Sequence, residues 1–196
     1  MKILASKYLK NRYKDQKRKV NMNNIPSWTS AEERKLLRVL AAEIPDGGNI
    51  LEIGCLYGGT TYELASVNPK VRVTTVDNFS WTPEGYPTAS AALAKKNLED
   101  NDVNNVSIVV GTSDEFLSKF PGEVDLSFID GGHSYEYVNP DLLACAKFSK
   151  VIVLHDYHND YEWMGITKAV DEFLQSNKKW MLDEIVGMMV VLRRTS

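Results

Sequence analysis

The chain has only two cysteines, Cys55 and Cys145, and they form neither a CxxC pair nor a zinc-like spacing. Two isolated cysteines in apolar segments do not make a disulfide framework, so we expect a reducing, cytoplasmic compartment. The chain also lacks any apolar run near the roughly 20 residues that a membrane-spanning helix needs. Its basic start is not followed by an apolar core and a small-residue cleavage site, so we expect no signal peptide.

The chain has little net charge, only −3, and this argues against nucleic-acid binding by the chain as a whole. The charge is nevertheless uneven, because residues 1–20 carry eight lysines and arginines against one aspartate. We interpret residues 1–28 as a basic N-terminal arm or helix and residues 29–196 as one domain. Such an arm could contact RNA, another anionic partner or a membrane surface, although a solvated lead-in helix or a partly disordered arm is the simpler interpretation.

The dinucleotide fingerprint GxGxxG is absent, but residues 49–61 contain a different glycine loop. A short apolar segment there ends in a glycine turn, and a helical segment starts near Gly59. A strand, a glycine-rich turn and a helix in this order form the nucleotide-binding unit of α/β folds, in which free N–H groups at the helix start favour an anion. The spacing is ExGxxxGxT, filled by Glu52, Gly54, Gly58 and Thr60.

Strand-like and helix-like segments alternate along the rest of the chain. We expect strands at 49–54, 71–77, 106–111, 124–130 and 150–156, and helices at 59–67, 88–100, 113–119 and about 135–147. This βαβα order predicts a parallel sheet that is covered on both faces. Apolar spacing predicts a further helix at 166–174, and the segments that flank Gly187 predict an antiparallel hairpin. Before all of these, Thr29 or Ser30 can cap a helix that ends near Pro45.

The glycine loop resembles motif I of the class I S-adenosylmethionine (SAM) methyltransferases. Five β/α units followed by a helix and a hairpin are similar to the sheet of that family. The resemblance implies an α/β, Rossmann-like class I methyltransferase fold, with a mostly parallel seven-stranded sheet, an antiparallel last strand and helices on both faces. It also implies that SAM is the cofactor and that Glu52 and Tyr57 face its methionine end.

Polar residues gather where the predicted strands end, which is where open α/β sheets bind their ligands. Asp77 ends the second strand, 23 residues after Gly54, and its carboxylate can accept both hydroxyls of a ribose. Ser113 and Asp114 follow the third strand, where this family meets the adenine. They could instead cap the helix that begins there.

The segment 129–135, IDGGHSY, and the His-Asp pair at 155–156 resemble the macrocin/mycinamicin-type (IDGxH) branch of small-molecule O-methyltransferases. Asp130 and Asp156 would lie at neighbouring strand ends and could share a hard cation such as Mg²⁺, which lowers the pKa of a bound hydroxyl. His133 has the pKa range of a general base. We therefore assign His133 and Asp130 to catalysis, Asp130 also to cofactor binding, and Asp130 and Asp156 to a metal.

The chain departs from this branch directly after Asp156. Metal-dependent relatives carry a further acid or amide there, and this chain has Tyr157. His158, Asp160 or water molecules could complete the metal's ligands. Alternatively the metal has been lost and His133 acts alone, so the sequence leaves the metal open.

The resulting hypothesis is O-methylation of a small sugar or phenolic hydroxyl. The irregular segments 79–87 and 157–163 are candidate acceptor walls, in which Trp81 or Tyr86 could stack on a ring. Two alternatives stay open, namely a non-catalytic SAM-fold binding or scaffold protein and an RNA methyltransferase that uses the basic arm. The loop spacing and the terminal hairpin argue against an NAD(P)-linked oxidoreductase, and the sequence leaves a homo-oligomer open.

Overall fold

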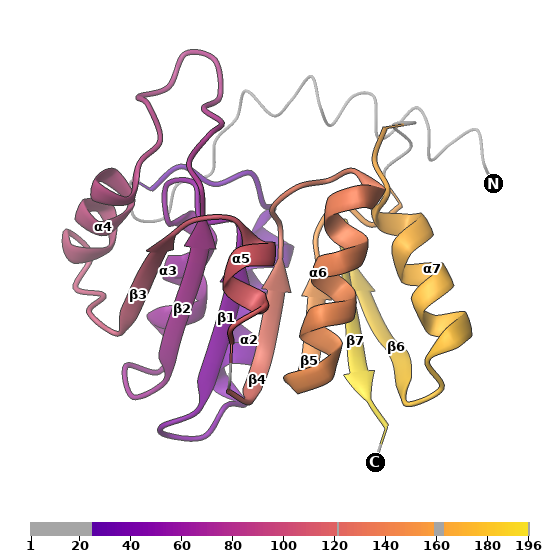
Figure 1. Ribbon diagram of the computed structural model, residues 1–196. Helices are drawn as coiled ribbons and strands as arrows, with labels where there is room; N and C mark the ends of the chain where they lie inside the picture. Colours follow the sequence, from indigo (N-terminus) through magenta and orange to yellow (C-terminus); the bar gives the residue numbers. More distant parts are fainter. Residues whose placement is uncertain (1–24, 121, 159–162, 196) are drawn as a thin grey trace.

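The computed structural model describes residues 25–120, 122–158 and 163–195 (Figure 1). Most of the predicted basic arm therefore lies outside the described residues. The strands are β1 (Asn49–Ile53), β2 (Arg72–Asp77), β3 (Val106–Val110), β4 (Val124–Ile129), β5 (Ser149–Leu154), β6 (Trp180–Val186) and β7 (Met189–Arg194). The helices are α2 (Ala31–Ala42), α3 (Gly59–Ala65), α4 (Ala91–Glu99), α5 (Ser113–Leu117), α6 (Tyr135–Phe148) and α7 (Ile166–Ser176).

The strands form one seven-stranded sheet in the order β3-β2-β1-β4-β5-β7-β6. The neighbours from β3 to β5 pair in parallel, whereas β7 runs antiparallel to both β5 and β6. The β6–β7 hairpin turns at Gly187, whose φ of 62° lies in the left-handed region that favours glycine. The predicted fold class, including the antiparallel last strand, is confirmed.

Helices cover both faces of the sheet, as expected for parallel strands (Figure 1). Alternation along β1 divides the core, since Ile50 packs with α2 and α3 while Leu51 and Ile53 pack with α6 and α7. Glu52 shares the face of Ile50, which places its carboxylate beneath the start of α3. No helix in the described part of the chain has both the length and the apolar character needed to cross a membrane.

Side-chain caps confirm one predicted helix start and correct another. Ser30 caps α2, because its hydroxyl accepts the N–H of Glu33 at 3.2 Å while the Glu33 carboxylate accepts the N–H of Ser30 at 2.6 Å. Ser90 caps α4 in the same manner by accepting the N–H of Leu93 at 3.2 Å. Helix α4 therefore starts at Ala91, three residues later than predicted, because the cap residue itself is extended.

The described end of the predicted arm packs against the glycine loop. Ile25 is buried with Tyr57, and the Trp28 ring lies 5.1 Å from that of Tyr86. A Cβ on Gly59 would lie only 2.6 Å from the carbonyl oxygen of Pro26, so glycine is required at this close approach. Residues 25–28 are therefore part of the folded domain.

Candidate active site

The carboxyl ends of the central strands meet at one edge of the sheet, and backbone hydrogen bonds continue the ladder past each strand. Gly54 donates to Val76 at 2.9 Å, and Asp130 donates to Ile53 at 2.8 Å. His155 then donates to the carbonyl of Ile129 at 3.1 Å. The predicted site residues at the ends of β1, β2, β4 and β5 are thus gathered along one edge.

The glycine loop has the backbone geometry that the motif predicted. Gly54 and Gly58 have φ values of 95° and 85°, which L-residues rarely adopt. A Cβ on Gly54 would also collide with the carbonyl oxygen of Asp130. The loop therefore brings β1 against the end of β4, and α3 starts directly after Gly58 with its first N–H groups at the ligand edge.

Asp77 holds the glycine loop in place. Its Oδ2 accepts the N–H groups of Cys55 and Leu56, each at 2.8 Å, and its Oδ1 accepts the N–H of Phe79 at 2.7 Å. Each carboxylate oxygen has two lone pairs, so three of the four acceptor sites are used and one on Oδ1 remains for a ribose hydroxyl. Asp77 therefore combines a loop-fixing role, which the sequence did not reveal, with the position expected of a ribose ligand.

Glu52 and Thr60, two residues of the motif, bind each other. The Glu52 carboxylate is fully buried and accepts the hydroxyl of Thr60 at 2.7 Å as well as that of Thr61. Burial raises the pKa of Glu52 to about 7, although the hydroxyl donors act in the opposite direction. The Thr60 hydroxyl is thus already bound to Glu52. Thr60 would therefore bind an anion at the helix start through its backbone N–H.

The remaining predicted cofactor residues lie on either side of this edge. Tyr57 is 1% exposed and donates its hydroxyl to the carbonyl of Pro87 at 2.5 Å, within an aromatic cluster that includes Tyr86. Ser113 is the first residue of α5 and not its cap, which is Thr112. Asp114 is exposed in the first turn of the same helix.

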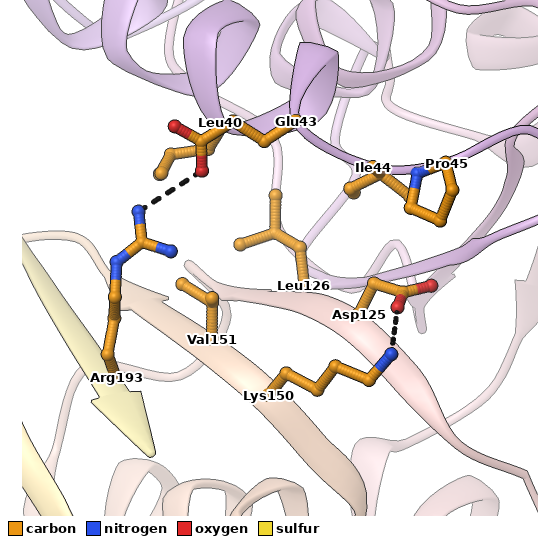
Figure 2. Close-up of a pocket in the computed structure, with 9 residues that line it drawn as sticks. All are labelled: Leu40, Glu43, Ile44, Pro45, Asp125, Leu126, Lys150, Val151 and Arg193. Atoms are coloured by element: carbon orange, nitrogen blue, oxygen red, sulfur yellow. Dashed lines mark hydrogen bonds and ion pairs between the residues drawn. The ribbon is translucent and has the colours of Figure 1, made fainter. Parts of the chain in front are cut away.

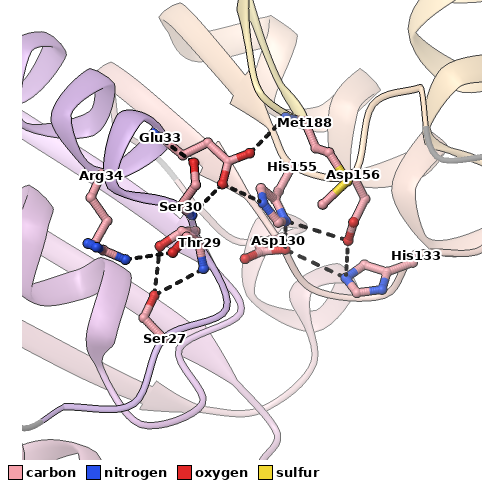
Figure 3. Close-up of polar contacts among 10 residues, drawn as sticks. All are labelled: Ser27, Thr29, Ser30, Glu33, Arg34, Asp130, His133, His155, Asp156 and Met188. Atoms are coloured by element: carbon pink, nitrogen blue, oxygen red, sulfur yellow. Dashed lines mark hydrogen bonds and ion pairs between the residues drawn. The ribbon is translucent and has the colours of Figure 1, made fainter. Parts of the chain in front are cut away.

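Asp130, His133 and Asp156 form one cluster, with a ligand atom of each within 4.8 Å of the others. Nε2 of His133 lies 3.6 Å from Oδ1 of Asp130 and 3.5 Å from Oδ2 of Asp156 (Figure 3). Asp156 has a φ of 59°, an uncommon backbone conformation for a residue other than glycine. Strained residues of this kind often mark functional sites.

His155 lies behind this cluster. Its Nδ1 is 3.3 Å from Oδ1 of Asp130 and 3.5 Å from Oδ2 of Asp156, and its Nε2 is 3.7 Å from Oε2 of Glu33. Burial alone would lower the pKa of His155, but the surrounding carboxylates raise it well above its usual value. Burial alone would raise the pKa of Asp130, but His155 and His133 lower it. The site is therefore an alternating array of carboxylates and imidazoles.

Neither Tyr157 nor His158, which follow Asp156, belongs to the cluster of Asp130, His133 and Asp156. The Tyr157 hydroxyl turns away from the cluster and donates to Asp171 on α7 at 3.0 Å. His158 places its ring 4.0 Å from that of Tyr157 and is not among the described residues that converge on the two aspartates. Asp160 lies outside the described residues. Among the described residues, His133 is the one that joins Asp130 and Asp156 in the group able to hold a metal ion.

Glu33 also contacts the candidate site, through His155, and the sequence did not predict this contact. Its place three residues after Ser30 indicated only a helix cap. An acidic residue in a capping box has a sufficient local explanation, so nothing in the sequence pointed to a second role. A buried carboxylate is costly without further partners, and that consideration becomes available only once its 1% exposure is known.

A hollow lies at the opposite edge of the sheet, between the end of α2 and the starts of β4 and β5. Figure 2 shows its two ion pairs, Lys150 with Asp125 at 2.7 Å and Arg193 with Glu43 at 3.2 Å. Its floor is apolar and includes Leu126. Because both cations are paired within the hollow, we assign no ligand to it.

A family model described as a methyltransferase domain matches residues 51–157, more than half of the chain. The chain belongs to this methyltransferase family. The matched segment runs from the glycine loop through the Asp130–His133–Asp156 cluster, so the candidate site lies within it.

A probable cobalt-precorrin-6B C(15)-methyltransferase (decarboxylating) of Sulfurisphaera tokodaii is 32% identical over 120 residues, which cover 61% of this chain and 57% of that protein. The chain thus spans less than two thirds of the length of this curated relative. Among solved structures, the O-methyltransferase TomG of Streptomyces achromogenes, in complex with SAM, has a TM-score of 0.66 at 22% identity, covering 86% of this chain and 82% of TomG. The O-methyltransferase NovP has a TM-score of 0.73 at 18% identity, with coverage of 87% and 82%. These two structures share the fold.

Proposed function

We propose that the protein is a SAM-dependent O-methyltransferase that methylates a sugar or phenolic hydroxyl of a small molecule. The observation that carries the proposal is the convergence of His133, Asp130 and Asp156 next to the glycine loop of a methyltransferase fold. A base and two carboxylates at this edge are suited to take the proton of a hydroxyl group. The IDGxH-type sequence of this segment supports the same branch.

SAM, when bound, supplies a methyl group on a positively charged sulfur. Asp77 would bind a ribose hydroxyl, the N–H groups at the start of α3 would face the carboxylate of the methionine part, and Ser113 or Asp114 would contact the adenine. The acceptor would then approach at the end of β4, where Asp130 stands next to Gly54. Holding the acceptor oxygen in line with that methyl group is then the main catalytic contribution.

His133 is suited to act as the general base. Its side chain is 30% exposed, so an acceptor can approach it from solvent. The His133 imidazole would accept the O–H proton of the acceptor, whose oxygen would take the methyl group that SAM supplies. Burial would lower the pKa of His133, but Asp130 and Asp156 raise it. The neutral form, which accepts the proton, therefore becomes more populated as the pH rises through this raised pKa.

The same cluster fits a divalent cation. Asp130 and Asp156 offer the carboxylate oxygens that Mg²⁺ prefers, and water could complete the shell because Mg²⁺ commonly keeps several water ligands. The imidazoles of His133 and His155 already lie within 3.6 Å of these carboxylates, which weighs against very tight binding. A bound cation would lower the pKa of an acceptor hydroxyl.

Trp163 supports an acceptor that contains a ring. Its indole is 59% exposed, and its ring centroid lies 6.1 Å from that of His133. Two residues later, Gly165 donates its N–H to the carbonyl of His133 at 2.8 Å, which ties this segment to the loop that carries the base. A flat sugar or phenol face could pack on this indole with its hydroxyl directed at the base.

Two observations bear on the alternatives. A scaffold without catalysis would be favoured if the cluster were buried away from solvent, but the side chains of Asp130 and His133 are 22% and 30% exposed. Carbon methylation is a second candidate, because the relative in S. tokodaii is named a C(15)-methyltransferase. The basic arm that suggested RNA lies mostly outside the described residues.

The test is incubation of the protein with SAM that carries a deuterated methyl group, together with catechol or methyl glucoside in separate reactions. Mass spectrometry of the products distinguishes a labelled methyl ether from a labelled C-methyl group. We expect a methyl ether from at least one of the two acceptors. A C-methylated product, or release of S-adenosylhomocysteine without any ether, would contradict O-methylation.

A further inference from the structure

Glu33 reaches the candidate site from a helix that precedes the glycine loop (Figure 3). It is the third residue of α2 and is 1% exposed. Its Oε2 accepts the N–H of Ser30 at 2.6 Å, and its Oε1 accepts the N–H of Met188 at 2.7 Å. Helix capping accounts for the contact with Ser30, but not for the contact with the hairpin or for the position beside His155.

The His155 ring lies between Glu33 and the two aspartates. The ring is 5% exposed, and its nitrogens face carboxylates on opposite sides, Nε2 toward Glu33 at 3.7 Å and Nδ1 toward Asp130 at 3.3 Å. Nε2 makes no hydrogen bond within the described part of the chain. The polar group that it faces is the Glu33 carboxylate, at ion-pair distance. Because burying an unpaired ring nitrogen is costly, this contact favours one orientation of the ring.

Met188 gives Glu33 a second connection to the site. Its N–H is donated to Glu33, and its carbonyl accepts the N–H of Tyr157, the residue after Asp156, at 2.9 Å. A Cβ on Gly187 would collide with Oε1 of Glu33, so the hairpin turn closes directly over the carboxylate. Glu33 is thereby fixed from the helix side and from the hairpin side.

We propose that Glu33 is a positioning residue for the active site, which holds Asp130 and Asp156 in place through the His155 ring. The same two oxygens that His155 contacts, Oδ1 of Asp130 and Oδ2 of Asp156, also face Nε2 of His133. Carboxylates that orient a histidine behind a reactive centre occur in metal sites and in catalytic triads. The effect of Glu33 on rate rests on the proposed function, whereas its effect on the geometry of the site does not.

The imidazole signals in long-range ¹H–¹⁵N spectra test this geometry, because the chain has only three histidines. The informative variant is Glu33→Gln, and the matched control is Ser30→Ala, which removes the hydroxyl that caps Glu33 N–H at 3.2 Å but keeps the carboxylate beside His155. We expect Glu33→Gln to shift the ring signals of both His155 and His133, although Glu33 does not face the latter. Ser30→Ala should lower the thermal midpoint and leave both rings unchanged.

Ring signals in Glu33→Gln that change no more than in the Ser30→Ala control would overturn the proposal and leave Glu33 as a helix cap. If Glu33→Gln does not fold, the proposal is tested on the wild-type protein instead. A nuclear Overhauser contact between the Nε2 proton of His155 and the γ-protons of Glu33 is expected, and its absence from a spectrum that shows this proton's other contacts overturns the proposal.

Kinetics supply the second readout. With an acceptor that the wild type methylates, Glu33→Gln should lower kcat by about 10- to 100-fold without changing the KM for SAM. An unchanged kcat would overturn the positioning role. A wild type that methylates no acceptor would contradict the proposed function only, because the ring shifts are measured without turnover.

Discussion

His133 and His155 share the same two acceptor atoms, Oδ1 of Asp130 and Oδ2 of Asp156. Two carboxylates at such short range repel each other in a site shielded from water, and the imidazoles offset this repulsion. The two rings differ in exposure, at 30% for His133 and 5% for His155. The exposed ring can meet an acceptor, and the buried ring can only hold the carboxylates.

Replacing His133 with Gln should remove the general base. We expect kcat to fall by about 10²- to 10⁴-fold, with S-adenosylhomocysteine binding unchanged because the glycine loop is intact. Steady-state kinetics and calorimetry measure the two quantities. His158→Gln is the matched control, since its ring packs on Tyr157 outside the cluster, and equal losses in both variants would exclude a specific role for His133.

Mg²⁺ should stabilise the protein through Asp156. At a hundredfold excess over Kd, a ligand of the folded state contributes about 2.7 kcal/mol, which raises the Tm of a chain of this size by about 5–10 °C. Asp156→Asn should abolish the rise. Asp171→Asn, which changes the nearby partner of the Tyr157 hydroxyl, should retain it. A wild-type Tm that is insensitive to millimolar Mg²⁺ and Mn²⁺ would argue for His133 acting without a metal.

Gly54→Ala should unfold or strongly destabilise the domain. The substitution combines a φ of 95° with a collision against Asp130, whereas Gly47, with a φ of 81°, has nothing near an added Cβ. Gly47→Ala therefore reports the left-handed strain alone, about 1 kcal/mol. Urea unfolding compares the two, and a similar loss in both would show that the loop tolerates a side chain at Gly54.

Glu52 should make the protein less stable as the pH rises from 5 to 8. Burial raises its pKa from 4.5 to about 7, so the folded state keeps the proton that the unfolded state releases between these values. Such a shift corresponds to at most about 3 kcal/mol, lost progressively across that window. The Glu52→Gln variant, which cannot ionise, should lose less stability between pH 5 and 8 in urea unfolding. Parallel pH profiles for the two proteins would contradict this account.

Local signals in the sequence predicted most of the fold. The glycine loop, the alternating strands and the hairpin at Gly187 each depend on residues that are close in sequence, and all three are present in the structure. The meeting of Asp130 and Asp156 was also predictable, because parallel strands end at a common edge. The position of β7 between β5 and β6 was not predicted, since strand order depends on long-range packing.

The contacts behind the site could not be read from the sequence. Glu33 and Met188 are 155 residues apart, and each has a sufficient local explanation as a cap residue or a hairpin residue. Tyr157 follows Asp156 directly, yet its left-handed predecessor turns its side chain toward α7 and away from the cluster. Side-chain direction at such a backbone position depends on tertiary packing, which a residue pattern does not encode.

Binding of S-adenosylhomocysteine, measured by calorimetry, tests the central claim most directly. We expect micromolar affinity for the wild type and a loss of about 1–3 kcal/mol in Asp77→Ala. Asp125→Ala is the matched control, because its carboxylate also accepts a backbone N–H, from Asn49 at 2.8 Å, but at the opposite edge of the sheet. Unchanged affinity in Asp77→Ala would contradict the assigned ribose site. A wild type that binds no S-adenosylhomocysteine would contradict the conclusion that the protein is a SAM-dependent enzyme.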